Sequence, residues 1–92
     1  MYSMYRERDG QGDSGGMSMA FWFDEEGNPV QEHNAKPRVG VIMRVGSIHA
    51  RTMTAQDWWQ TTFIKEILEE TDTQVKFKTE NGSIYEWRRY ET

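Results

Sequence analysis

VGVIMRVGSIHARTM, residues 39–53, is the stretch that decides the fold, because two alternating apolar runs meet in it at Gly46-Ser47. Glycine at the first central position of a two-residue loop suits a type II′ turn, so the stretch predicts a β-hairpin. This register places Val45 opposite Ile48 and sends alternate side chains to opposite faces. One face is then apolar, and the other carries Arg44, His49 and Arg51.

A second hairpin is predicted over residues 74–90, around the turn Glu80-Asn81-Gly82. A two-residue Asn-Gly loop would put lysines on the aromatic face. A three-residue loop instead places Val75 opposite Trp87 and leaves one face apolar, so the longer loop is expected. It requires the left-handed conformation at its glycine, which glycine adopts at little cost.

Residues 54–70 allow two interpretations. Their apolar residues recur at helical spacing, and Thr54 with Asp57 resembles a capping box, which favours an amphipathic helix over residues 55–70. The β-favouring run that begins at Thr61 instead indicates a strand over residues 61–69. With that strand as a bridge, the two hairpins form a small curled antiparallel sheet or SH3-like barrel; with the helix, the fold is α+β.

The front of the chain differs in composition from the rest. Residues 1–18 mix charge with Gly and Ser and show no apolar period, which predicts a disordered tail. Residues 19–37 predict a short aromatic strand, a turn and a linker. Residues 38–92 are therefore expected to be the folded β-rich domain.

Size and charge limit the function classes. A chain of 92 residues buries a modest core, so oligomerisation is expected to help it. The net charge is −4, and the excess of negative charge lies in residues 1–35, where seven acids accompany two arginines. This charge argues against nonspecific nucleic-acid binding. The chain has no cysteine and no apolar run of membrane-spanning length, so we expect a protein of a reducing cytoplasm without membrane contact.

Catalytic and metal-binding motifs are missing from the sequence. His33 and His49 show no metal-ligand spacing, and no nucleophile elbow or P-loop occurs. We therefore expect a protein that is not an enzyme and that needs neither a metal nor a cofactor.

The cationic face of the first predicted hairpin is the candidate ligand site. Guanidinium groups suit phosphate, and an indole ring can stack on a base. The expected ligand-binding residues are Arg44, Ser47, His49, Arg51, Trp58, Trp59, Thr61 and Thr62. In the alternative interpretation the arginines form a solvated face paired with Glu66 or Glu69, and the tryptophans belong to the core.

Three segments, RVGSIHART, DWWQTTFIKEIL and TQVKFKTENGSIYEW, resemble a group of small bacteriophage proteins of mostly unassigned function. The resemblance covers about residues 38–88 and implies that the paired-threonine segment is a strand. It also implies an anti-defence protein that sequesters a cyclic dinucleotide or related signalling nucleotide in homo-oligomers in the host cytoplasm. The alternatives are an inhibitor that docks on a host defence enzyme through the acidic N-terminal segment, and a phage assembly protein.

Overall fold

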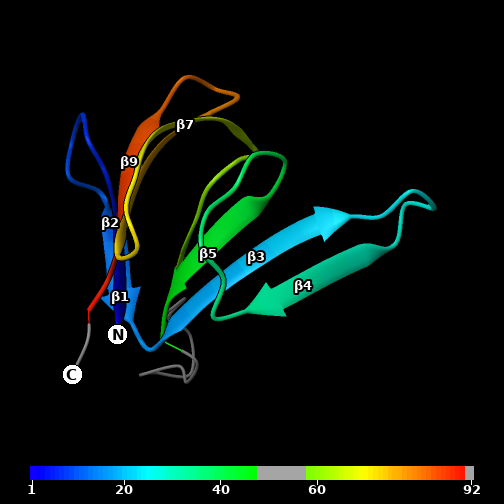
Figure 1. The fold of residues 1–92 in the computed structure, drawn as a ribbon, viewed down its shortest axis with the longest axis horizontal. Coiled ribbons are helices and arrows are strands. Elements are labelled where there is room, and N and C mark those ends of the chain that lie inside the picture. The colour runs from blue at the N-terminus through cyan, green and yellow to red at the C-terminus, as the bar shows by residue number, and fades with distance from the viewer. Residues whose placement is uncertain (48–57, 91–92) are drawn as a thin grey trace.

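The computed structural model describes residues 1–47 and 58–90, which form nine β-strands and no helix (Figure 1). The strands are β1 (Tyr2–Arg6), β2 (Gly12–Gly15), β3 (Met17–Phe23), β4 (Pro29–His33), β5 (Ile42–Gly46), β6 (Trp58–Gln60), β7 (Ile64–Glu70), β8 (Gln74–Thr79) and β9 (Ile84–Arg89). The all-β prediction is confirmed. The helix considered for residues 55–70 is wrong, because β6 and β7 occupy its described part.

The strands form two antiparallel sheets that share one core. Sheet A has the order β2-β1-β9-β8-β7, and sheet B has the order β4-β3-β5-β6. The chain passes from sheet A to sheet B through Gly16, and it returns through residues 61–63. Backbone hydrogen bonds from Thr61 to Met43 and from Ile64 to Val41 continue the pairing across the second corner. The two sheets therefore close into a small barrel, and β4 lies outside it on the free side of β3 (Figure 1).

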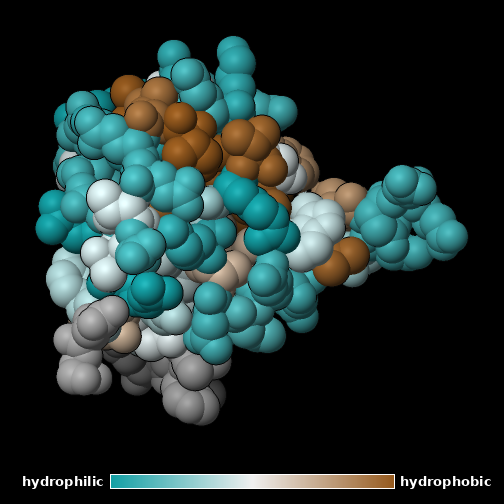
Figure 2. Space-filling model, in the orientation of Figure 1, coloured by the Kyte–Doolittle hydropathy of each residue, from teal (hydrophilic) through white to brown (hydrophobic). Residues whose placement is uncertain are grey.

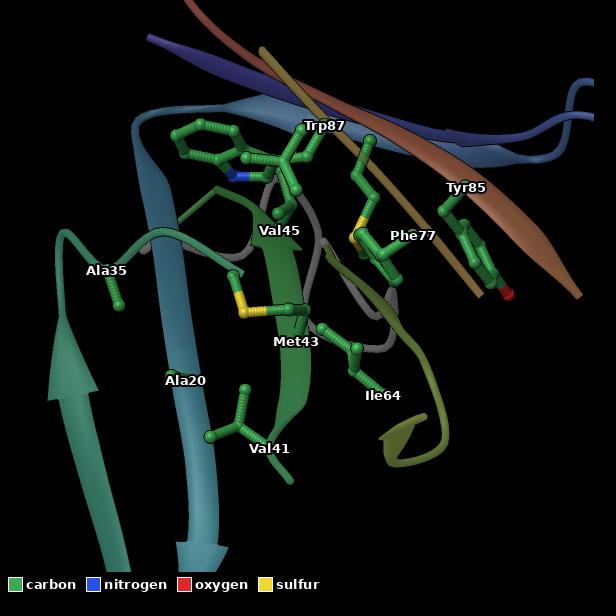
Figure 3. Close-up of a cluster of buried hydrophobic side chains, with 11 residues drawn as sticks. Ala20, Ala35, Val41, Met43, Val45, Ile64, Phe77, Tyr85 and Trp87 are labelled. Atoms are coloured by element: carbon green, nitrogen blue, oxygen red, sulfur yellow. The ribbon is translucent and has the colours of Figure 1, made fainter. Parts of the chain in front are cut away.

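The core fills the space between the two sheets (Figure 3). Trp87 and Phe77 enter it from sheet A, whereas Met43 and Val45 enter it from sheet B, and all four side chains are fully buried. Alternation along β5 explains this, because Ile42 and Arg44 point outward between the buried residues, as the sequence predicted.

The hairpin β8–β9 has the predicted register. Val75 is paired with Trp87, Phe77 with Tyr85. Gly82 has a φ of 86°, as the three-residue loop requires. This prediction is confirmed. The sequence could make it because local alternation and turn chemistry lie within one hairpin.

The disordered tail expected over residues 1–18 is a wrong prediction. Its residues form β1, β2 and the start of β3, and Met4 is fully buried beside Trp87. The glycines here mark a close approach of two backbones: a Cβ on Gly15 would lie 2.3 Å from the carbonyl oxygen of Gly46. The expected aromatic strand and turn of residues 19–37 are present, but a second strand that was not expected, β4, lies between the turn and the linker.

The tight hairpin predicted at Gly46-Ser47 is also wrong. Gly46 is paired with Met17 on one side and with Trp58 on the other. A strand has only two edges, so no edge remains there for the segment that follows directly. Residues 48–57, the predicted second arm of this hairpin, lie outside the described residues.

Candidate functional site

The outward side chains of sheet B form a surface that we call the Arg44 face. The register of the four strands defines it, because directly opposed residues of antiparallel strands share a face. Its members are Met17, Met19, Phe21, Phe23, Pro29, Gln31, His33, Ile42, Arg44, Trp58 and Gln60. Met19 is buried, with 4% of its surface exposed, so the accessible part of the face is made by the other members. None of these side chains is a carboxylate, although the chain has a net charge of −4.

Arg44 lies in the middle of this face. Its Nε and Nη2 donate to the Gln60 side-chain oxygen at 3.1 and 2.6 Å, and its guanidinium carbon lies 5.2 Å from the centre of the Trp58 ring. An amide is neutral, so Gln60 orients the guanidinium without neutralising it. Within residues 1–47 and 58–90 no carboxylate forms a salt bridge with Arg44.

Aromatic side chains lie on two sides of Arg44. Trp58 lies on the neighbouring strand β6, two residues from Gln60, the partner of Arg44 on that strand. Phe21 lies on the other neighbouring strand, β3, two residues from Met19, the partner of Arg44 there. Two residues along a strand span about 7 Å and neighbouring strands are about 4.8 Å apart, so each backbone position is roughly 8 Å from Arg44. The face therefore offers a cation between two apolar ring surfaces.

The outer face of sheet A has a different character. Lys76 pairs with Glu7 at 3.1 Å, and Gln74 donates to Glu86 at 3.0 Å. The hydrogen bond to Glu7 raises the pKa of Lys76. Lys76, Glu7 and Glu86 thus have partners within the chain, which is typical of a solvated surface.

The structure brings two of the sequence-predicted site residues together and directs a third to the opposite side of the sheet. Arg44 and Trp58 lie together on the Arg44 face. Trp59 points the other way, packs against the core and donates from Nε1 to the Tyr85 hydroxyl at 3.1 Å. For Trp59 the alternative core assignment is therefore correct.

The hydroxyl of Thr61 is committed to the backbone. It accepts from the Met43 N–H at 3.1 Å and donates to the Thr62 carbonyl at 2.7 Å, and the residue is buried. Thr61 therefore fixes the corner between β6 and β7, and in this structure both hydrogen bonds of its hydroxyl are made to the backbone. Thr62 is exposed, and Ser47 directly follows β5.

Two further predicted ligand residues, His49 and Arg51, lie outside the described residues. The predicted pairing of arginines with Glu66 or Glu69 does not occur for Arg44. These carboxylates instead lie on β7, in register with the lysines of β8.

Sequence reasoning identified only Arg44 and Trp58 as ligand residues of this face and missed the other members, among them Met19, His33 and Gln60. Met19 separates Arg44 from His33 on one line across the sheet, and Gln60 ends that line. The sequence could have indicated Gln60, because it lies two residues after Trp58 and therefore points to the same face of the strand. It could not have indicated Met19 or His33, because their positions beside Arg44 depend on the order of the strands in the sheet.

Comparisons with protein-family models, with curated proteins and with solved structures find no match for this chain. The described part of the chain contains no helix that is long and apolar enough to span a bilayer. It also contains no cluster of three or more histidine, aspartate or glutamate side chains arranged to hold a metal ion.

Proposed function

We propose that this protein is a non-enzymatic binding protein whose Arg44 face holds a phosphorylated nucleotide. The observation that supports this most is the guanidinium of Arg44 beside the Trp58 ring, on a face whose described members include no carboxylate. The resemblance to small bacteriophage proteins adds the biological role: sequestration of a cyclic or related signalling nucleotide that would otherwise activate host defence.

The chemistry of the site suits such a ligand. A phosphate oxygen can replace the Gln60 oxygen as the acceptor for Arg44, and a charge-assisted hydrogen bond contributes about 1.5–3 kcal/mol. Stacking of a base on Trp58 contributes about 1–3 kcal/mol more. With further contacts to the amides of the face, these contributions reach micromolar affinity.

A thermal-shift panel tests the proposal with cyclic dinucleotides, cyclic trinucleotides and ADP-ribose derivatives. A ligand present at 100 times its dissociation constant stabilises the fold by about 2.7 kcal/mol, so a ligand of this class should raise the melting temperature by several degrees. Arg44→Ala and Trp58→Ala should each remove the shift while the unliganded protein stays folded.

Arg88→Ala is the matched control, because Arg88 lies on the outer face of sheet A and is exposed. It should leave the ligand-induced shift unchanged. If no member of the panel shifts the wild-type protein, or if Arg44→Ala retains the full shift, the proposal is wrong.

A second candidate is an inhibitor that docks through acidic residues near the N-terminus. Glu7 pairs with Lys76 and Asp9 with Arg6. The exposed acids Asp24, Glu25 and Glu26 lie at the tip of the β3–β4 hairpin, which protrudes from the molecule as a hydrophilic lobe (Figure 2). Phe23, beside them, is 52% exposed.

Capture from host lysate tests this candidate. Wild-type protein should retain a host protein that a Glu25→Lys, Glu26→Lys double variant loses. Equal capture by both, or by neither, rejects the inhibitor hypothesis.

A further inference from the structure

The open edge of β4 is the least protected edge of the described fold. The other three edge strands are each protected from pairing with a further strand. Gly15 of β2 lies against the backbone of Gly46, β6 is only three residues long, and β7 has two register shifts against β8. In contrast, β4 pairs with β3 over five residues without a shift and has no described neighbour on its other side. Edges of this kind pair readily with another strand.

The backbone groups on this edge can be assigned from the hairpin geometry. The Asp24 N–H donates to the Asn28 carbonyl at 2.9 Å, so alternate residues of β4 from Asn28 onward face β3. The N–H and C=O groups of Gln31 and His33 therefore point away from β3. Pro29 is the third outward position and lacks an N–H.

We propose that two copies of this chain pair through β4, antiparallel and about a two-fold axis at Gln31. The opposed residues are then Gln31 with Gln31, Val30 with Glu32, and Pro29 with His33 of the second copy. No like charges are opposed. The Gln31 side-chain amide of each chain lies on the axis, where it can donate a hydrogen bond to Gln31 of the second copy and accept one from it. The edge is thus compatible with itself, as a two-fold interface requires.

The charges of the hairpin are compatible with a second copy as the partner. Asp24, Glu25 and Glu26 lie at the hairpin tip, so antiparallel pairing places the two tips at opposite ends of the joined strands and keeps these acids apart. The remaining acid of the hairpin, Glu32, pairs with Arg38 of its own chain at 2.9 Å and lies opposite the apolar Val30 of the second copy.

The pairing would join the two Arg44 faces. The two-fold axis is perpendicular to the sheet, so four strands from each copy form one continuous sheet with both Arg44 faces on the same side. The two Arg44 residues are then separated by five strand spacings and four residues along the strand, or roughly 25–30 Å. This dimer does not depend on what the Arg44 face binds.

Sedimentation velocity from about 5 to about 500 µM tests the pairing, since an interface this small should dissociate in the micromolar range. The wild-type protein should shift from monomer to dimer with concentration. Gln31→Pro should remain a monomer and keep its melting temperature, because it removes only an outward N–H. Val30→Pro is the control that loses an N–H directed at β3, so it should lower the melting temperature instead.

Cysteine cross-linking tests the register. The chain has no cysteine, so Gln31→Cys introduces a single thiol on the proposed axis. Directly opposed, hydrogen-bonded residues have Cα atoms about 5.5 Å apart, within the range that a disulfide spans. Oxidation should therefore link Gln31→Cys into dimers much faster than Glu25→Cys, which lies on the same hairpin but far from the axis. Equal rates, a wild-type monomer at the highest concentration, or a dimer that Gln31→Pro leaves intact would overturn the proposal.

Discussion

Replacing Ser18 by alanine should destabilise the protein more than any other removal of a single hydroxyl oxygen. Ser18 Oγ accepts from Trp87 Nε1 at 2.9 Å and donates to the Ala35 carbonyl at 2.8 Å. Ser18 is 1% exposed and Trp87 is fully buried. One hydroxyl thus connects sheet A, sheet B and the segment that follows β4.

The magnitude follows from the two groups that Ser18→Ala leaves without partners. A buried donor or acceptor that loses its hydrogen bond costs about 1–3 kcal/mol, so the indole N–H and the carbonyl together cost about 2–6 kcal/mol. The total free energy of unfolding for a domain is about 5–15 kcal/mol. At mid-range values the variant is therefore expected to lose about 4 of about 10 kcal/mol, or about two fifths of its stability.

Urea unfolding followed by tryptophan fluorescence measures this loss. With a slope of about 2 kcal/mol per molar urea, the midpoint should fall by about 1–3 M at unchanged slope. Ser3→Ala is the matched control: Ser3 is buried too, but its hydroxyl contacts the hydroxyl of Tyr90, an exposed residue that water can reach. Loss of stability in Ser18→Ala within about 0.5 kcal/mol of that in Ser3→Ala would refute the reasoning, because this margin is the usual size of a surface substitution.

Two further predictions concern the N-terminal strands. Gly15→Ala places a Cβ 2.3 Å from the Gly46 carbonyl oxygen and should lower the free energy of unfolding by about 1–3 kcal/mol in urea titrations, whereas Gly16→Ala meets no atom within 4 Å and should not. The hydrogen bond from Arg6 lowers the pKa of Asp9 to about 2. The contribution of the ionised Asp9 carboxylate to the free energy of unfolding is therefore complete above pH 4 and is lost as the pH falls toward 2. The melting-temperature difference between wild type and Asp9→Asn should accordingly shrink over that interval.

The parts of the fold that the sequence predicted correctly are those set by near neighbours. The β8–β9 hairpin depends on alternation over a few residues and on the turn glycine Gly82, and both are visible in the sequence. The alternation of β5 is also local, and Arg44 faces outward whichever strand pairs with it.

The pairing of β5 could not be predicted in the same way. Its partners β3 and β6 are set by closure of the barrel, which involves residues far apart in the chain. A glycine followed by serine suggests a turn, but Gly46 is a site where the backbone of Gly15 approaches closely. Both roles favour glycine, so the residue type alone does not distinguish them.

The N-terminal strands were missed for a related reason. β1 needs few apolar residues, because β2 and β9 supply hydrogen bonds on both sides and Met4 alone is fully buried in the core.

The candidate site was predicted only in part. Alternation along their strands shows that Arg44 and Trp58 point outward, whereas the place of His33 on the face depends on which strand lies beside β3.

The distribution of charge restricts what the Arg44 face can accept. The face has no carboxylate, yet the chain that surrounds it is acidic, and Asp24, Glu25 and Glu26 extend from the end of β3. In the proposed complex, a small nucleotide would place its phosphate at Arg44 and its base on a ring, within the face. A long nucleic acid would carry further phosphates past the face toward these acids, where like charges repel. The proposed specificity for small nucleotides therefore follows from the placement of these acids as much as from Arg44 itself.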